Sequence, residues 1–458
     1  MAGQRKFIVA LAFVIVLAAF AFFVLSRAAD KRSATGQTLP DGSTLRLGTV
    51  QFTNGNFSYT ATRLKGWQTA LLRILPVKLA DKLVNGRLSG GITFGSGATG
   101  TNLCVFTIHE GRANSKFNNM RIQVFDDLGN TFDAGTTRGV MSTSDMINEL
   151  RVEGWCPPAF PRRGKMIGLR FYEWGKSNAP CLAEFTMPNP APGNYPVWTP
   201  ESLPATRNTN ELTVTLVSLQ SGLSEARQTN AAASNEIAMT QAAFRIVQSG
   251  NGSNSWRPKE VEISDATGNH WTPFASVVSN RHEDGMDYFS FEGALWSGEA
   301  TWKMRFEFSR VADFDPAEVF TFSDVVVPGA TQVINLENST NVGGSKLQLV
   351  AITGEKAKQP GNLKWSTVED YMNVSIKAAP FPKGFRLNLL RVTDDSGREA
   401  EVLRGPDWNS PERVYPFKTP KGAKQLNFTF ALHKSRFVEF LAKPEYVYGG
   451  DAFHGETR

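Results

Sequence analysis

The residues of this chain best suited to chemistry are three aspartates, each followed three positions later by a glycine. They are Asp126, Asp265 and Asp394, with Gly129, Gly268 and Gly397. Clustered carboxylates bind calcium, but calcium takes six or more oxygen ligands, and each of these loops offers only one or two carboxylates. An Asp side chain also accepts hydrogen bonds from nearby backbone N–H groups, and Gly takes the positive φ of a tight turn. The spacing therefore favours three structural turns over three metal sites.

Two further segments have the composition of functional sites. Residues 95–100 match the G-x-G-x-x-G pattern of a dinucleotide-binding loop. A phosphate cradle needs a helix after these glycines, whereas a strand-like run from Leu103 to Phe106 follows them. Residues 282–287 form a dense polar cluster around His282, of the kind a metal site or a general base uses. We interpret the first segment as a loop and the second as a solvated hairpin turn at Gly285.

The common catalytic motifs are absent from the sequence. No G-x-S-x-G, H-E-x-x-H or Ser-x-x-Lys pattern occurs, and no cysteine–histidine spacing indicates zinc. We therefore expect no enzyme and no cofactor. The paired carboxylates of a glycoside hydrolase leave no spacing signature, so that activity stays open as a distant alternative.

The Asp turns belong to a larger pattern that occurs three times in the same order. Each copy has an opening strand, the Asp turn, a strand centred on Phe and a closing strand that contains Glu. The opening strands begin at Leu45, Leu212 and Leu347, the central phenylalanines are Phe171, Phe306 and Phe430, and the closing glutamates are Glu184, Glu318 and Glu439. Alternating apolar residues place one face of each strand in a core. The sequence therefore predicts an all-β protein of three tandem antiparallel β-sandwich modules.

The copies and the segments between them define the predicted organisation. It comprises a signal anchor at 1–32, module 1 at 43–188, a Pro-rich linker at 189–209, module 2 at 210–328, a linker at 329–344, module 3 at 345–443 and a tail at 444–458. The prolines of the first linker should hold it extended, as a strut between modules. Tyr195 and Trp198 leave open that it docks on a neighbouring sandwich.

Seven short strands in the first copy indicate a sandwich. They are predicted near 44–53, 102–108, 119–125, 131–134, 149–154, 166–173 and 182–187. On these strands the chain resembles immunoglobulin-like or fibronectin type III-like modules over most of 43–443, and its layout is similar to that of uncharacterised bacterial envelope proteins. Copies two and three contain no cysteine, so apolar packing must replace the inter-sheet disulfide of antibody domains. The resemblance implies an architecture and no activity.

The N-terminus determines where the modules are expected. Residues 7–25 form 19 consecutive apolar residues, which is long enough to span a hydrocarbon core as a helix. A cleaved signal peptide is the alternative, but its apolar region is usually shorter, and Arg27 stands where a small residue is wanted. We predict a retained transmembrane helix with the C-terminal part periplasmic or extracellular, where tandem sandwiches are common. The Lys and Arg residues flanking the span slightly favour the opposite orientation.

Charge and cysteines add two constraints. Of the 49 Lys and Arg residues, five lie in residues 1–32, and the remainder is almost balanced by acidic residues. The ectodomain therefore has no global positive field, and we expect no nucleic-acid partner. Cys104, Cys156 and Cys181 all lie in the first copy. We interpret them as free thiols, with a bridge from Cys104 to one of the other two as the alternative.

The largest departure from the repeat is an insertion in module 1 at about 57–100. Apolar residues recur in it every four positions, which predicts short helices interrupted at Pro76. This stripe caps the first sandwich, or it lies with its surrounding basic residues on anionic lipid or a partner helix. The candidate interaction surface consists of Trp67, Leu71, Arg73, Leu75, Lys78, Leu79 and Lys82.

The sequence thus predicts a non-catalytic, membrane-anchored scaffold, spacer or protein-interaction subunit of the cell envelope. Its expected partners are the membrane and a protein or a second copy of the chain. Carbohydrate binding or adhesion is the alternative, because exposed aromatic rings on a sandwich stack on sugars. The candidate rings are Trp155, Trp174, Trp271, Trp296, Trp365 and Trp408.

Overall fold

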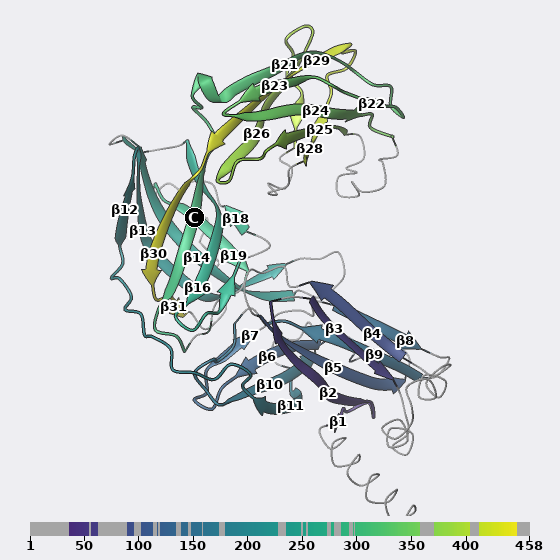
Figure 1. Cartoon of the computed structure of the whole chain (residues 1–458), viewed down its shortest axis with the longest axis vertical. Coiled ribbons are helices and arrows are strands. Elements are labelled where there is room, and N and C mark those ends of the chain that lie inside the picture. Colours follow the sequence, from purple (N-terminus) through teal and green to yellow (C-terminus); the bar gives the residue numbers. More distant parts are fainter. Residues whose placement is uncertain are drawn as a thin grey trace, which may run out of the picture.

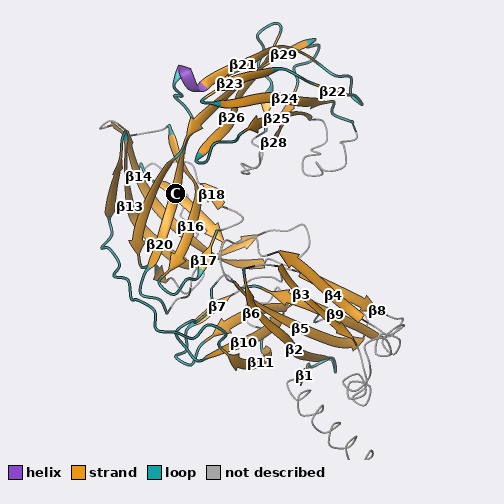
Figure 2. Cartoon of the chain, in the orientation of Figure 1, coloured by secondary structure: helices purple, strands orange, loops and turns teal. Residues whose placement is uncertain are grey.

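The computed structural model is almost entirely β-structure (Figure 2). It describes residues 36–54, 56–62, 89–95, 102–112, 117, 120–133, 139–144, 148–157, 159–173, 179–227, 235–248, 251–252, 255–272, 276–278, 285–292, 296, 298–357, 371–403 and 412–446. Within these ranges the one helical element is a 3₁₀ turn at Pro316–Glu318. None of the described helical structure is long and apolar enough to cross a membrane. The predicted anchor at 1–32 lies outside the described residues.

Six of the seven sheets in the described residues lie in three face-to-face pairs and the seventh has only two strands, which confirms the prediction of a sandwich-like all-β chain (Figure 1). In the N-terminal sheet pair, the five-stranded sheet has the order β1 (Gly36–Thr38), β2 (Thr44–Thr53), β5 (Asn102–Arg112), β9 (Asn148–Trp155) and β8 (Gly139–Ser144). The facing four-stranded sheet has the order β11 (Cys181–Pro188), β10 (Met166–Glu173), β6 (Met120–Phe125) and β7 (Thr131–Asp133). All seven strands predicted in this region occur in these two sheets, of which β1 and β8 are additional strands.

The middle sheet pair follows in the sequence. Its larger sheet has the order β12 (Ala205–Thr209), β13 (Leu212–Arg227), β14 (Asn235–Gln248), β19 (Asp287–Glu292) and β18 (Ser276–Val278), with β15 (Asn251–Gly252) on β14 and β31 (Glu445–Tyr446) parallel to β13. Its four-stranded sheet has the order β17 (His270–Trp271), β16 (Trp256–Asp265), β20 (Trp302–Arg310) and β30 (Arg436–Ala442).

The C-terminal sheet pair has a three-stranded and a six-stranded sheet. The smaller has the order β21 (Val319–Val326), β29 (Gln425–Lys434) and β26 (Phe385–Asp394). The larger has the order β22 (Val333–Asn335), β24 (Ser345–Thr353), β25 (Met372–Ala379), β28 (Glu412–Lys418) and β27 (Glu401–Val402), with β23 (Ser339–Val342) on β24.

The middle and C-terminal sheet pairs exchange their closing strands. In the N-terminal pair, the Phe-centred strand β10 pairs with the strand that follows it, β11. The equivalent strand of the middle pair, β20, pairs instead with β30 from the end of the chain. The strand that follows β20 in sequence, β21, pairs with β29 of the C-terminal pair. Each of these two sheet pairs is therefore completed by a strand that the repeat assigns to the other.

The exchange differs from the predicted modules at 210–328 and 345–443, which were each continuous in sequence. Only Ser435 separates β29 from β30, so the chain runs from one sheet pair into the other almost without a break (Figure 1). Both closing strands bury apolar side chains on the face that meets a core, Phe322 and Val325 on β21 and Val438 and Phe440 on β30. This apolar face does not assign either strand to one core. Phe440 of β30 is fully buried against Phe244 and Phe306 of the middle pair, whereas Phe322 of β21 is buried beside Phe430 of the C-terminal pair.

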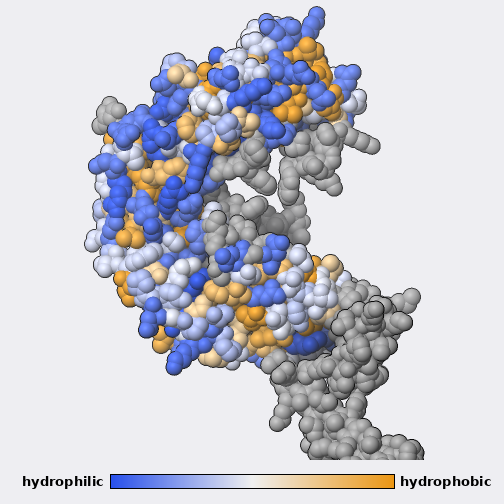
Figure 3. Space-filling view, in the orientation of Figure 1, coloured by the Kyte–Doolittle hydropathy of each residue, from blue (hydrophilic) through white to orange (hydrophobic). Residues whose placement is uncertain are grey.

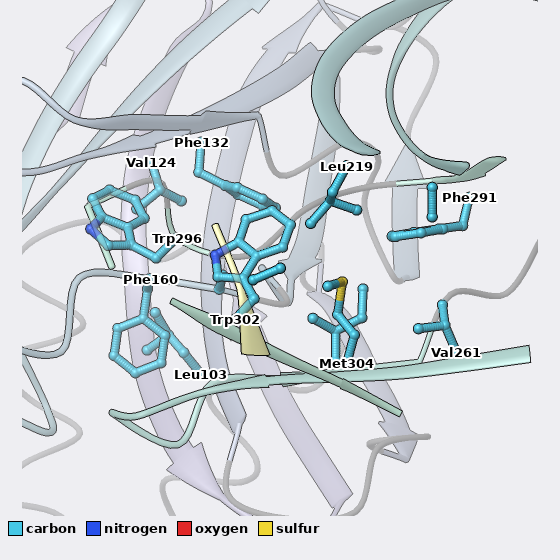
Figure 4. Close-up of a cluster of buried hydrophobic side chains, with 14 of the residues drawn as sticks. Leu103, Val124, Phe132, Phe160, Leu219, Val261, Phe291, Trp296, Trp302 and Met304 are labelled. Carbon is cyan, nitrogen blue, oxygen red and sulfur yellow. The ribbon is translucent and has the colours of Figure 1, made fainter. Parts of the chain in front are cut away.

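The N-terminal and middle sheet pairs share one apolar cluster. Val124 and Phe132 of the N-terminal pair belong to the same buried cluster as Trp296 and Trp302 of the middle pair (Figure 4). The C-terminal pair has its own core. The Pro-rich segment therefore does not hold the first two sheet pairs apart, because they pack directly on each other.

The ends of the predicted insertion form a hairpin. Strands β3 (Asn56–Thr62) and β4 (Ser89–Gly95) pair with each other, and Phe57 packs in a small separate cluster with Phe106 and Val152. Residues 96–101, which hold the rest of the G-x-G-x-x-G pattern, lie outside the described residues, and the next described strand is β5. Residues 63–88, where the short helices are predicted, lie outside the described residues.

Replacing Phe440, the buried ring of the exchanged strand β30, should destabilise the middle sheet pair. This is expected even though Phe440 follows the C-terminal sheet pair in the sequence. We expect Phe440→Ala to cost about 3–5 kcal/mol, because it removes a fully buried ring. Hydrogen exchange should show faster amide exchange in β16 and β20 than in the parent chain. The matched variant Phe428→Ala, on β29, should instead affect β26 and β29. If Phe440→Ala loosens β26 and β29 and spares β16 and β20, the strand exchange is wrong.

Candidate functional site

The three Asp turns form as the sequence predicts. In each turn, Oδ1 of the Asp accepts hydrogen bonds from the backbone N–H groups two and four residues later, with N···O distances of 2.8–3.1 Å. The glycines have φ values of 86°, 91° and 77° for Gly129, Gly268 and Gly397. Both features are those of a tight turn closed by an Asp side chain. The carboxylates are thus engaged by the backbone, and the prediction of structural turns is confirmed.

The second turn also serves as a docking point between sheet pairs. Oδ1 of Asn269, at the end of this turn, accepts a hydrogen bond from Nε of Arg162 at 3.0 Å, and Nδ2 donates to the carbonyl of Phe160 at 3.1 Å. Asn269 is almost completely buried. Arg162 and Phe160 come from the loop before β10, in the N-terminal sheet pair. The repeat identified Asn269 only as part of a turn, so the sequence missed this contact.

Arg163 joins three segments at the same junction. Its guanidinium binds the buried Glu299 of the middle pair through two hydrogen bonds, Nε to Oε1 at 2.8 Å and Nη2 to Oε2 at 2.9 Å. The same group donates to the carbonyls of Tyr195 and Pro196 at 2.8 and 2.7 Å. Thr301 holds the next part of the Pro-rich segment by donating to the carbonyl of Trp198 at 2.8 Å. The segment is therefore fastened to both sheet pairs, which is the docked arrangement that Tyr195 and Trp198 left open.

A buried ion pair lies where the exchanged strands cross. Arg386 of β26 is 1% exposed and binds Glu307 of β20 through two hydrogen bonds of 2.7 Å. Its Nη2 also lies 2.8 Å from Oε1 of Glu260 on β16. Ser435, the residue between β29 and β30, donates to Oε1 of Glu307 at 2.5 Å. The carboxylate of Glu307 thus has hydrogen-bond donors on both oxygens, and a buried two-point ion pair has a defined geometry. It therefore fixes the orientation of the C-terminal sheet pair on the middle sheet pair.

A buried histidine adds a second polar contact at this crossing. Nε2 of His433, on β29, accepts the backbone N–H of Arg310 at 3.2 Å and lies 2.9 Å from Oγ of Ser309. Because a backbone amide can only donate, Nε2 is the unprotonated ring nitrogen, and the Ser309 hydroxyl donates to it as well. His433 and Ser309 are both buried. This imidazole is therefore part of the junction between the sheet pairs.

One serine–histidine pair in the N-terminal sheet pair has the residue types of a hydrolase. Oγ of Ser43 lies 2.8 Å from Nε2 of His109 and donates to Oδ1 of Asp41 at 2.6 Å. Since the single hydroxyl proton goes to the carboxylate, His109 donates its Nε2 proton to Ser43 and does not act as a base on it. A catalytic triad places the imidazole between the other two groups, and here the hydroxyl has that place. Burial lowers the pKa of His109, which favours this neutral donor.

Glu153, on β9 of the same sheet pair, is a buried carboxylate. Its side chain is 1% exposed, and Oε1 accepts a hydrogen bond from Nε of Arg151 at 2.7 Å. Oε2 is buried without a hydrogen-bond partner in the described part of the chain. Burial raises the pKa of Glu153 to about 7 against the opposing effect of Arg151. A buried carboxyl of this kind titrates near neutral pH and makes the stability of the N-terminal pair depend on pH.

The remaining predicted site residues fall into two groups. The whole candidate interaction surface lies outside the described residues, as do Trp174, Trp365 and Trp408. Trp155 and Trp296 are buried, and Trp271 is partly buried against the core. In the polar cluster at 282–287, the structure describes Gly285, with a φ of 76°, to Asp287, which lies 3.3 Å from Nε of Arg257. Within the described ranges, no three His, Cys, Asp or Glu side chains converge on a metal site.

Comparison with known proteins adds no family assignment. No protein-family model and no curated protein matches this chain.

Removing the charge at the strand crossing should destabilise the protein strongly. We expect Arg386→Met to lower the free energy of unfolding by about 3–5 kcal/mol, because Glu307 is left buried without its partner. The double variant Arg386→Met/Glu307→Leu should recover much of this loss, since no unpaired charge remains buried there and Glu260, which also loses Arg386, is 37% exposed to water. Arg170→Met removes the exposed pair with Glu184 and should cost less than about 1 kcal/mol. Denaturant unfolding measures all three, and equal losses for Arg386→Met and Arg170→Met would contradict the account.

The stability of the protein should depend on Glu153 between about pH 4.5 and pH 7. A carboxyl whose pKa is higher in the folded than in the unfolded chain stabilises the fold when protonated, and this contribution is lost as pH rises through the folded value. Glu153→Gln should therefore gain stability over the parent chain across this window, by up to about 3 kcal/mol above pH 7. Melting temperatures measured from pH 4 to pH 8 test this. Glu149→Gln, on the same strand, is the control, and a pH-independent difference for Glu153→Gln would refute the prediction.

Proposed function

We propose that this chain is a non-catalytic, membrane-anchored scaffold of the cell envelope, exposed on the periplasmic or extracellular side. In this proposal the sheet pairs are three immunoglobulin-like or fibronectin type III-like sandwiches, the second and third of which exchange closing strands. Residues 1–32 form the anchor, and the predicted surface at residues 67–82 contacts a protein partner or a second copy of the chain.

The observation that carries the proposal is the locking of all three sheet pairs to one another. A shared apolar core and the Arg163–Glu299 pair hold the first junction, and two exchanged strands with the Arg386–Glu307 pair hold the second. Interfaces between independent domains are small and polar, and the domains move relative to each other. A chain held at both junctions by burial and strand pairing keeps its ends at a fixed separation and orientation, as a scaffold or spacer requires.

The curved arrangement of the sheet pairs agrees with such a role (Figure 3). Large apolar side chains exposed among the described residues are few and scattered, and none of them is aromatic. They are Leu128, Val140, Met141, Met166, Val197, Val326 and Val333. Glycan binding, the alternative function, needs exposed rings for stacking, and the two buried candidate tryptophans are unsuited to it. Hydrolysis stays a distant alternative, and we assign no catalytic residue.

Crosslinking in native membranes tests the proposal. The full-length chain, tagged at its C-terminus, is crosslinked in intact membranes and purified under denaturing conditions. We expect one protein partner, or a second copy of the chain, in stoichiometric amount. The triple variant Arg73→Glu/Lys78→Glu/Lys82→Glu should lose this partner, because it reverses the charge of the predicted surface.

A matched variant separates a specific contact from a general effect of charge. Lys346, Lys421 and Lys424 are exposed on the C-terminal sheet pair, and replacing all three by Glu changes the net charge equally. This variant should keep the partner. A chain that sits in the membrane without a stoichiometric protein partner would overturn the scaffold function, and recovery of a glycan instead would favour the alternative.

A further inference from the structure

Two of the three cysteines occupy opposite positions on neighbouring strands. Cys104 lies on β5, and the register of β5 with β9 pairs Val105 with Trp155. One step further along this antiparallel pair, Cys104 faces Cys156. Residues directly opposite each other in such a pair have Cα atoms about 4.5–5.5 Å apart, which lies within the span of about 4.4–6.8 Å that disulfides bridge.

Both thiols also point to the same side of the sheet. Cys104 is completely buried in the small cluster with Phe106, Ile108 and Val152, and Cys156 packs against this cluster. Successive side chains of a strand alternate between faces, so Cys104 shares its face with residues 106 and 108. A hydrogen bond between the two thiols, together with burial, raises the pKa of Cys104. The register and the shared cluster therefore place the two thiols side by side on one face of the sheet.

We propose that Cys104 and Cys156 form a cross-strand disulfide when the protein meets a disulfide donor, such as oxidised glutathione or a thiol–disulfide oxidoreductase, and that Cys181 forms no bond to either of them. Cys181 lies on β11 of the facing sheet, where it is exposed. Neither strand register nor a shared cluster brings it near the other two. This inference concerns a covalent modification and does not depend on the proposed scaffold function.

Exposure determines the order of the exchange steps. Cys156 is half-buried and Cys104 is not exposed, so the thiolate of Cys156 attacks the donor disulfide and one glutathione leaves as a thiolate. Cys104 then gives up its proton and attacks the sulfur of Cys156 in the mixed disulfide, and the second glutathione leaves. The two protein thiols lose two electrons and two protons, and the donor disulfide becomes two thiols.

The expected bond ties β5 to β9 beneath the β3–β4 hairpin, whose residues Phe57 and Ala61 pack in the same cluster. It would close a loop that contains β6, β7 and β8 and so restrict the unfolded chain. The N-terminal pair would then resist unfolding more in an oxidising compartment than in a reducing one.

Peptide mapping of the full-length chain tests the inference. The folded protein is incubated with oxidised glutathione, free thiols are alkylated in denaturant, and the chain is digested without reductant and analysed by mass spectrometry. We expect a linked pair of peptides that contain Cys104 and Cys156, and Cys181 in no protein–protein linkage, either alkylated or carrying one glutathione. The linked pair should disappear on reduction and should form in monomeric protein.

Two variants make the result specific. Cys181→Ser should give the same linked peptides at the same rate, whereas Cys156→Ser should leave Cys104 alkylated, with circular dichroism as the check that it folds. Alkylated Cys104 and Cys156 in the parent chain after prolonged oxidation would overturn the proposal. A disulfide between Cys181 and either of them would overturn it too.

Discussion

The structure depends on a reciprocal exchange of two strands. Because β30 completes the sheet of β20 and β21 completes the sheet of β29, neither the middle nor the C-terminal sheet pair has its full core until the other is made. Main-chain pairing and buried phenylalanines supply most of this coupling, since burial of apolar surface is the dominant stabilising contribution in folding. The Arg386–Glu307 ion pair fixes the relative orientation of the two sheet pairs, because a buried charge is stable only in the arrangement that brings its partner into contact.

The two junctions use different physical means to the same effect. The first junction is a continuous apolar core with polar contacts at its edge. There Arg163 donates hydrogen bonds to the buried carboxylate of Glu299, and Asn269 donates to the carbonyl of Phe160. The second places polar groups at its centre, between strands that cross from one sheet pair to the other. Both leave the sheet pairs little freedom to move, and both require the polar residues that lie buried between the sheets to be paired.

Strands, turns and class of fold could be predicted from the sequence, because alternation and Asp–Gly spacing are local signals. The pairing of β21 and β30 could not be, because Phe322 and Phe440 suit either core and strand alternation carries no information about partners. Glu307 shows the same limit. Its position between Phe306 and Phe308 indicates a solvent-facing residue, and only the C-terminal pair packed over that face makes it buried. The docking of the Pro-rich segment is a further case of this limit, because the prolines indicate an extended segment but not the contacts with Arg163 and Thr301 that hold it against its neighbours.

Crosslinking of paired cysteines tests the strand exchange most directly. Arg305 of β20 lies opposite Glu439 of β30, and Thr429 is the equivalent of Arg305 in the C-terminal copy, because Phe306 and Phe430 correspond. The account predicts that Arg305→Cys/Glu439→Cys forms a disulfide on mild oxidation of the folded chain, and that Thr429→Cys/Glu439→Cys does not. Bonding between positions 429 and 439, with none between 305 and 439, would contradict the exchange and restore three modules that are each continuous in sequence.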